Sequence, residues 1–113
     1  MIKVKKHKVI ISPVAEIDIW ESVHYISANL GNPVAAQRML DSIEKYYGLL
    51  EQTPRMGTEY ITTSGAVYRY VIVGKYMLFY TIEDIDEGTD IVIRRFLFAP
   101  SNIGVRLDWG FPS

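Results

Sequence analysis

The chain has 113 residues, 49% of them hydrophobic, and a formal net charge of −1, which predicts one domain over residues 1–113 with a tail from 99 to 113. The absence of cysteine excludes a disulfide framework and a thiolate metal site. The net charge gives no overall attraction to nucleic acid, and because there are two histidines and no cofactor motif we expect neither metal nor cofactor.

The N-terminal segment combines lysines with a short apolar run, Val9 to Ile11. This run is shorter than a signal peptide core, and no stretch approaches the roughly 20 apolar residues that span a bilayer. We therefore expect a cytoplasmic protein that makes no membrane contact. The same run predicts a first strand at residues 4–11, lying between neighbours inside a sheet. The lysines around it are expected to be solvated and to protect a sheet edge, with phosphate binding as the alternative.

Two helices are predicted next, each opened by a capping residue followed by proline. Ser12-Pro13 begins the first, which Gly31 ends, and Asn32-Pro33 begins the second, which extends to about residue 51. The link between them is so short that the helices must form an antiparallel hairpin. The expected apolar stripes are Ala15, Ile19, Val23, Ile26 and Leu30 in the first helix and Ala36, Met39 or Leu40, Ile43, Tyr47 and Leu50 in the second.

The segment from Ala66 to Phe98 predicts three consecutive antiparallel strands, joined at Gly74-Lys75 and by an acidic loop over Glu83 to Asp90. The polar connector before it, residues 60–65, is either loop or a short extra strand. The predicted fold class is therefore α+β in the order β-α-α-β-β-β, with a helical hairpin on one face of a mainly antiparallel sheet. Alternation in the last strand places Ile91, Ile93, Arg95 and Leu97 opposite Val92, Arg94, Phe96 and Phe98.

Charged and aromatic side chains within these strands are the candidate functional residues. Arginine inside a strand is costly unless it faces water, a partner or a substrate, and Arg69 or Arg95 could instead pair with an acid of the first helix, namely Glu16, Asp18 or Glu21. Tyrosines could stack on bases, although packing is their commoner role. The tail is expected to cover the sheet or to contact a partner through Trp109 and Phe111. The candidate functional surface is Arg69, Tyr76, Tyr80, Arg94 and Arg95.

The order and spacing of these residues resemble the RelE/ParE superfamily of toxins from type II toxin–antitoxin (plasmid stabilisation) systems, over about residues 9–102. The matching positions are Ser12-Pro13 with Ala15, Asp18-Ile19 to Val23, Tyr25-Ile26, Ala35-Ala36 with Arg38, Leu50 with Pro54 and Gly57, Arg69, Tyr76, Tyr80, and Ile93 to Leu97. The resemblance implies a toxin that a cognate antitoxin neutralises through a segment lying along its helices or sheet.

Members of this superfamily differ in target, and the reactive positions distinguish them. RelE-like members cut messenger RNA on the ribosome with basic side chains and a tyrosine, whereas ParE-like members inhibit DNA gyrase by binding it. Here Arg69 keeps one basic position, but Val71 occupies the second, Met77 replaces an arginine and Phe98 replaces a histidine. Methionine and phenylalanine supply neither acid, base nor positive charge. The resemblance therefore favours a ParE-like protein, and no catalytic residue is assigned.

Two other functions stay open from the sequence. One is a ribosome-dependent endoribonuclease that uses Arg69, Arg94 or Arg95 with a tyrosine. The other is a family member that has lost toxicity. The expected partners are an antitoxin and DNA gyrase, or the ribosome and messenger RNA in the enzymatic alternative. Because both faces of the predicted sheet are apolar, a homodimer is also predicted.

Overall fold

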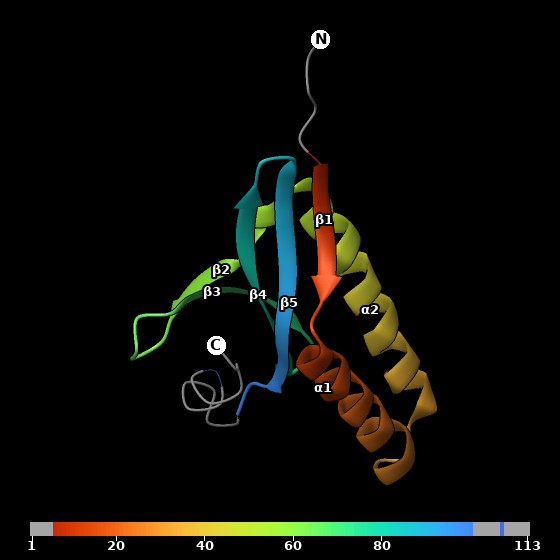
Figure 1. The fold of residues 1–113 in the computed structure, drawn as a ribbon. Helices are drawn as coiled ribbons and strands as arrows, with labels where there is room; N and C mark the ends of the chain where they lie inside the picture. Colours follow the sequence, from red (N-terminus) through yellow and green to blue (C-terminus); the bar gives the residue numbers. More distant parts are fainter. Residues whose placement is uncertain (1–5, 101–106, 108–113) are drawn as a thin grey trace.

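The computed structural model describes residues 6–100 and 107. Within this part of the chain a helical hairpin covers one face of a five-stranded sheet (Figure 1), which confirms the predicted α+β fold. The elements are β1 (Lys6–Ile11), α1 (Pro13–His24), a π-helix (Tyr25–Asn29), α2 (Pro33–Gln52), a 3₁₀ turn (Pro54–Met56), β2 (Thr58–Ile61), β3 (Val67–Val73), β4 (Tyr76–Ile85) and β5 (Gly88–Phe98). A short extra strand does form, but β2 begins before the connector predicted at residues 60–65 and overlaps it only at Tyr60 and Ile61.

The strand order is β1-β5-β4-β3-β2, with β1 parallel to β5 and the other pairs antiparallel. The prediction that β1 lies inside the sheet was wrong, because β1 is an edge strand (Figure 1) and Ile11 is 41% exposed. A continuous apolar run is compatible with a strand inside a sheet and with a strand at its edge, so the sequence does not distinguish the two. Lys6 and Lys8 are exposed on this edge, where lysine discourages pairing with another chain.

The hairpin between β4 and β5 is tighter than the predicted acidic loop. Glu83 pairs with Asp90 and Ile85 with Gly88, so only residues 86 and 87 form the turn. Glu83, Asp84, Asp86 and Glu87 are exposed, and a strand end with this much charge has the composition of a loop. The paired strands therefore extend further than expected.

Both helix starts agree with the sequence prediction. The side chain of Ser12 accepts a hydrogen bond from the backbone N–H of Ala15, and Asn32 does the same for Ala35. Gly31 has φ +61°, the left-handed geometry that favours glycine between the helices. In the described part of the chain, neither helix has the length and apolar content needed to cross a membrane.

The first helix does not continue as a regular α-helix to Leu30, as its stripe predicts. It changes to a π-helix at Tyr25–Asn29, and Leu30 is 60% exposed rather than packed. A π-helix inserts extra backbone into the helical turn, so the 3.6-residue period no longer predicts which side chains face the core. Upstream of this change, Ala15 and Ile19 are buried as expected and Val23 packs at the edge of the core. Ile26, within the π-helix, also packs there.

Strand β5 contains a register shift opposite Phe79 and Tyr80 of β4. Tyr80 pairs with Ile93 and Phe79 with Arg95, which leaves Arg94 as the extra residue of a bulge. As a result Phe96 packs in the same cluster as Ile93, while Leu97 packs in another. The alternation predicted for the last strand was therefore wrong after Ile93.

The sheet has an apolar cluster on each face. One cluster joins the sheet to the helices and includes Met39, Ile43, Leu78 and Tyr80, while the second contains Tyr68, Phe79, Leu97 and Leu107. Leu107 is fully buried, so at this position the tail covers the outer sheet face, as one reading of the sequence expects. Trp109 and Phe111 lie outside the described residues, and their predicted partner contact stays a prediction.

Tyr47 of α2 is expected to titrate at a higher pH than a tyrosine in water. Burial, followed by the charges of Glu44 and Glu16, raises its pKa from 10.0 to about 12. Between these pH values the unfolded chain has released this proton while the folded chain retains it, so stability falls as pH rises. Ultraviolet titration of tyrosinate should show a late component that Tyr47→Phe removes. If Tyr47→Phe removes a component near pH 10, the assignment is wrong.

Candidate functional site

The five predicted surface residues do not form one cluster, since only Arg69 and Tyr80 are cross-strand neighbours. Arg95 forms a buried ion pair with Asp18 of α1, in which its Nε and Nη2 donate to the two carboxylate oxygens over 2.6 and 2.9 Å. The side chains of both residues are about nine-tenths buried. Such two-point pairing is the geometry in which arginine binds carboxylate most strongly. Of the acids that the sequence offered to Arg95, Asp18 is therefore its partner.

The same carboxylate completes the edge of β5 where β1 ends. The backbone N–H of Phe96 donates to Asp18 Oδ2 over 3.0 Å. Just before it, the N–H of Ser12 donates to the carbonyl of Ile93, and Ser12 Oγ donates to the carbonyl of Arg94. Because a buried backbone group needs a partner, the start of α1 replaces β1 along this part of β5. Arg95 is thus committed to holding α1 against the sheet.

Arg94 leaves the strand on the side away from the helices. Its Nε donates to Thr81 Oγ1 over 2.9 Å, and its Nη2 donates to Glu83 over 2.7 Å. The side chains of Arg94 and Glu83 are 31% and 52% exposed, so water screens this pair and its contribution to stability is small. The guanidinium lies across β4 on the outer face.

Arg69 and Tyr80 are neighbours on β3 and β4 and bind the turn that follows α2. Arg69 Nη1 donates to the carbonyls of Arg55 and Gly57, and Nη2 contacts Glu59 at 3.5 Å. The Tyr80 hydroxyl donates to the Pro54 carbonyl over 2.8 Å and accepts the N–H of Gly57 over 2.9 Å. The pKa of Tyr80 is raised, because the effect of burial exceeds the opposing effects of the hydrogen bond from Gly57 and the charge of Arg69.

Gly57 fits into this network because it has no side chain. A Cβ at this position would lie 2.5 Å from the Tyr80 hydroxyl and 2.8 Å from the Tyr70 carbonyl. The turn therefore approaches the sheet more closely than any other residue type allows. The predicted functional pair Arg69 and Tyr80 is thus part of a packed connection between α2 and the sheet.

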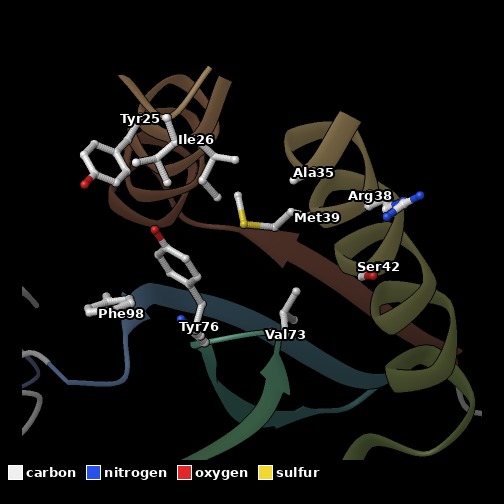
Figure 2. Close-up of a pocket in the computed structure, with 12 residues that line it drawn as sticks. Tyr25, Ile26, Ala35, Arg38, Met39, Ser42, Val73, Tyr76 and Phe98 are labelled. Carbon is white, nitrogen blue, oxygen red and sulfur yellow. The ribbon is translucent and has the colours of Figure 1, made fainter. Parts of the chain in front are cut away.

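Tyr76 alone of the five residues lines the largest described pocket, a hollow of about 480 Å³ between the helices and the turn of β3 and β4 (Figure 2). Its ring stacks on Phe96 at a centroid distance of 4.8 Å and meets Phe98 edge to face. The other lining residues come mainly from the ends of the helices and from the β3–β4 turn: Tyr25, Ile26, Leu30, Ala35, Arg38, Met39, Ser42, Val73, Gly74, Lys75 and Phe98.

This pocket is suited to an apolar group rather than to proton transfer. Met39, Val73 and Tyr76 face its interior in Figure 2, whereas Arg38 points away from α2 at its border. Its volume lies within the roughly 300–1,000 Å³ of ordinary ligand sites. Among the described residues no cluster of three or more His, Cys, Asp or Glu side chains is placed to hold a metal ion.

Sequence reasoning missed most residues of this pocket because their positions depend on tertiary structure. Tyr25 belongs to the unpredicted π-helix, and Val73 lies next to the turn at Gly74. Ala35 and Arg38 were identified from the sequence only as positions that match the family, with no indication that they line a pocket. The available signal was the predicted antiparallel hairpin, which brings the end of one helix beside the start of the next.

Comparison with known proteins gives one family match. A family model described as "ParE toxin of type II toxin-antitoxin system, parDE" matches residues 9–97. The matched segment begins within β1, ends one residue before the end of β5, and includes both helices, all three strand arginines and the pocket residues except Phe98. No curated protein matches the chain.

Proposed function

We propose that this chain, which belongs to the ParE toxin family of type II toxin–antitoxin systems, acts in the cytoplasm by binding and inhibiting DNA gyrase and is neutralised by a cognate antitoxin. Family membership makes it a toxin of this class, and its target and neutralisation are the proposal. The resemblance to gyrase-binding members, together with Val71, Met77 and Phe98 at the reactive positions, supports the target.

The single structural observation that carries the proposal is how the strand arginines are used. Arg95 binds Asp18 in the core, Arg69 binds two backbone carbonyls, and Arg94 binds Thr81 and Glu83. Metal-free RNA cleavage needs cationic groups and an acid and base gathered around one phosphate. Here the guanidiniums serve separate contacts with the protein itself. A protein that acts by occupying its target has no need of such a cluster.

The apolar pocket supports antitoxin binding. Its opening lies between the hairpin and the sheet (Figure 2), along the helices where the resemblance places an antitoxin segment. A hollow of this size can take one or two apolar side chains, which are typical anchors of a helix or extended peptide bound in a groove. We therefore assign the pocket to the antitoxin and leave gyrase binding to another surface.

The experiment is a supercoiling assay with purified gyrase, this protein and the small protein encoded beside it. We expect the toxin to inhibit supercoiling and the neighbouring protein to restore it. Ala35→Trp places a large side chain in the pocket and should weaken rescue at least tenfold while gyrase inhibition persists, because the two surfaces differ. Gln37→Trp, on the exposed side of α2, is the matched control and should leave rescue unchanged.

Two results would contradict the proposal separately. Growth arrest by the protein at concentrations that leave supercoiling unaffected would rule out gyrase as the target, and cleavage of translated messenger RNA would then support the ribonuclease alternative. If the neighbouring protein restored supercoiling fully with Ala35→Trp, the antitoxin would not bind in this pocket. The predicted homodimer is a separate prediction, for which sedimentation of the toxin alone is the measurement.

A further inference from the structure

Helix α1 carries an apolar stripe on the face that the core does not use. Ile17 and Trp20 are each 57% exposed, and their three-residue spacing places them side by side on the helix surface. His24, also exposed, continues the stripe one turn further. Buried Ala15 and Asp18 mark the opposite face of the helix. Two large side chains therefore remain in water although the helix already has a packed side.

A hollow of about 400 Å³ adjoins this stripe, lined by Trp20, Glu21, His24, Tyr25 and Asn29. It lies where α1 gives way to the π-helix at Tyr25–Asn29. Short π-helical turns are rare and occur frequently at functional sites. The exposed tryptophan thus has an open, shallow hollow beside it, against which a partner's side chain can pack. Tryptophan and tyrosine are also the residues most enriched among energetically important interface positions.

Negative charge borders the stripe on both sides. Glu16 precedes Trp20 by four residues and Glu21 follows Ile17 by four, so each carboxylate is a direct neighbour of one apolar side chain. Both glutamates are exposed, and neither forms an ion pair within the described part of the chain. The face is therefore apolar along its centre and acidic at its two borders.

We propose that this face of α1 docks an amphipathic helix from another protein, whose apolar stripe is flanked by lysine or arginine. Positions 17–24 extend over about 10 Å of helix, which matches two turns of a partner helix. Its apolar side chains cover Ile17 and Trp20 and enter the hollow beside Tyr25, while its cations meet Glu16 and Glu21.

The charge pattern selects a different protein over a second copy of this chain. A twofold contact places the same face of both molecules together, which brings the borders formed by Glu16 and Glu21 against their own copies. Like charges so placed oppose association. The surface is also distinct from the pocket assigned to the antitoxin: Tyr25 borders both hollows, but Trp20 lines only the hollow beside α1, and exposed Ile17 lines neither. One toxin can therefore hold two partners.

The test uses two synthetic helical peptides that share one apolar stripe, flanked in one by lysine and in the other by glutamate, with binding measured by calorimetry. The full chain is expected to bind the lysine peptide at least tenfold more tightly. Trp20→Ala should lower that affinity at least tenfold, and Ile17→Lys provides a second variant of the same face. Ile72→Ala, which changes a 52% exposed residue on β3, should leave it unchanged.

Charge reversal provides the sharper test. In the double variant Glu16→Lys with Glu21→Lys, we expect the preference to change to the glutamate peptide, while circular dichroism shows the same helix content. Equal affinity of the original chain for both peptides, or unchanged binding by Trp20→Ala and Ile17→Lys, would overturn the proposal. So would self-association that Trp20→Ala abolishes in ultracentrifugation, because the occupant would then be a second copy.

Discussion

Replacing Asp18 by asparagine is expected to cost about 3–5 kcal/mol of unfolding free energy, the usual effect of removing one partner of a buried ion pair. The amide leaves the Arg95 guanidinium charged in the core and offers only one oxygen to it and to the N–H of Phe96. Domains of this size have about 5–15 kcal/mol in total. The substitution should therefore remove a large part of the unfolding free energy, which urea denaturation of the original chain and of the variant measures.

Two further variants make this prediction specific. Glu83→Gln changes the exposed pair with Arg94 and should cost less than about 1 kcal/mol, because water screens that interaction. Asp18→Leu combined with Arg95→Met removes both buried charges and should recover much of the loss, since apolar replacements of a buried pair are often well tolerated. If Asp18→Asn costs no more than Glu83→Gln, the buried pair does not hold α1 to the sheet as described.

Tyr80→Phe is expected to cost about 2 kcal/mol, because it removes one hydroxyl that serves two backbone groups. The Gly57 N–H and the Pro54 carbonyl both lose their partner, and Gly57 is buried where water has little access. The effect should be local to the turn after α2. Hydrogen exchange at the Gly57 amide is therefore expected to accelerate more than exchange at amides in the centre of β5.

Tyr46→Phe is the matched control for that change. Tyr46 is half-buried on α2, and within the described residues its hydroxyl makes no hydrogen bond, so the same loss of an oxygen should alter stability by less than about 0.5 kcal/mol. Unchanged exchange at Gly57 in Tyr80→Phe would contradict the assigned hydrogen bonds, whatever the total stability.

The sequence predicted those parts of the fold that depend on short-range chemistry. Ser12-Pro13 and Asn32-Pro33 identify helix starts because capping is a contact between residues three apart. The hairpin topology follows from the short link around Gly31. By contrast, the edge position of β1 depends on its distant partner β5, and the apolar run Val9 to Ile11 is the same in either position.

The candidate site was harder to predict because a single bulge changes which residues share a face. Period-two alternation separates Phe96 from Ile93, but the extra residue at Arg94 brings them into one cluster. The sequence offered three acids to Arg95, and tertiary packing selected Asp18. The sequence singled out Tyr25 only as a position that matches the family, and because the π-helix gave no periodic signal, its exposed place at the border of the pocket came from the structure.

The parallel pairing of β1 with β5 has a consequence for synthesis of the toxin. Ile11 pairs with Ile93, and Asp18 forms its ion pair with Arg95, which is 77 positions later in the chain. A nascent chain on the ribosome therefore exposes its first strand and an unpaired carboxylate until the last strand has emerged. Closing contacts so distant in sequence is slow. A fragment released before Ile93 and Arg95 have been made lacks both partners, so a folded toxin requires synthesis through β5.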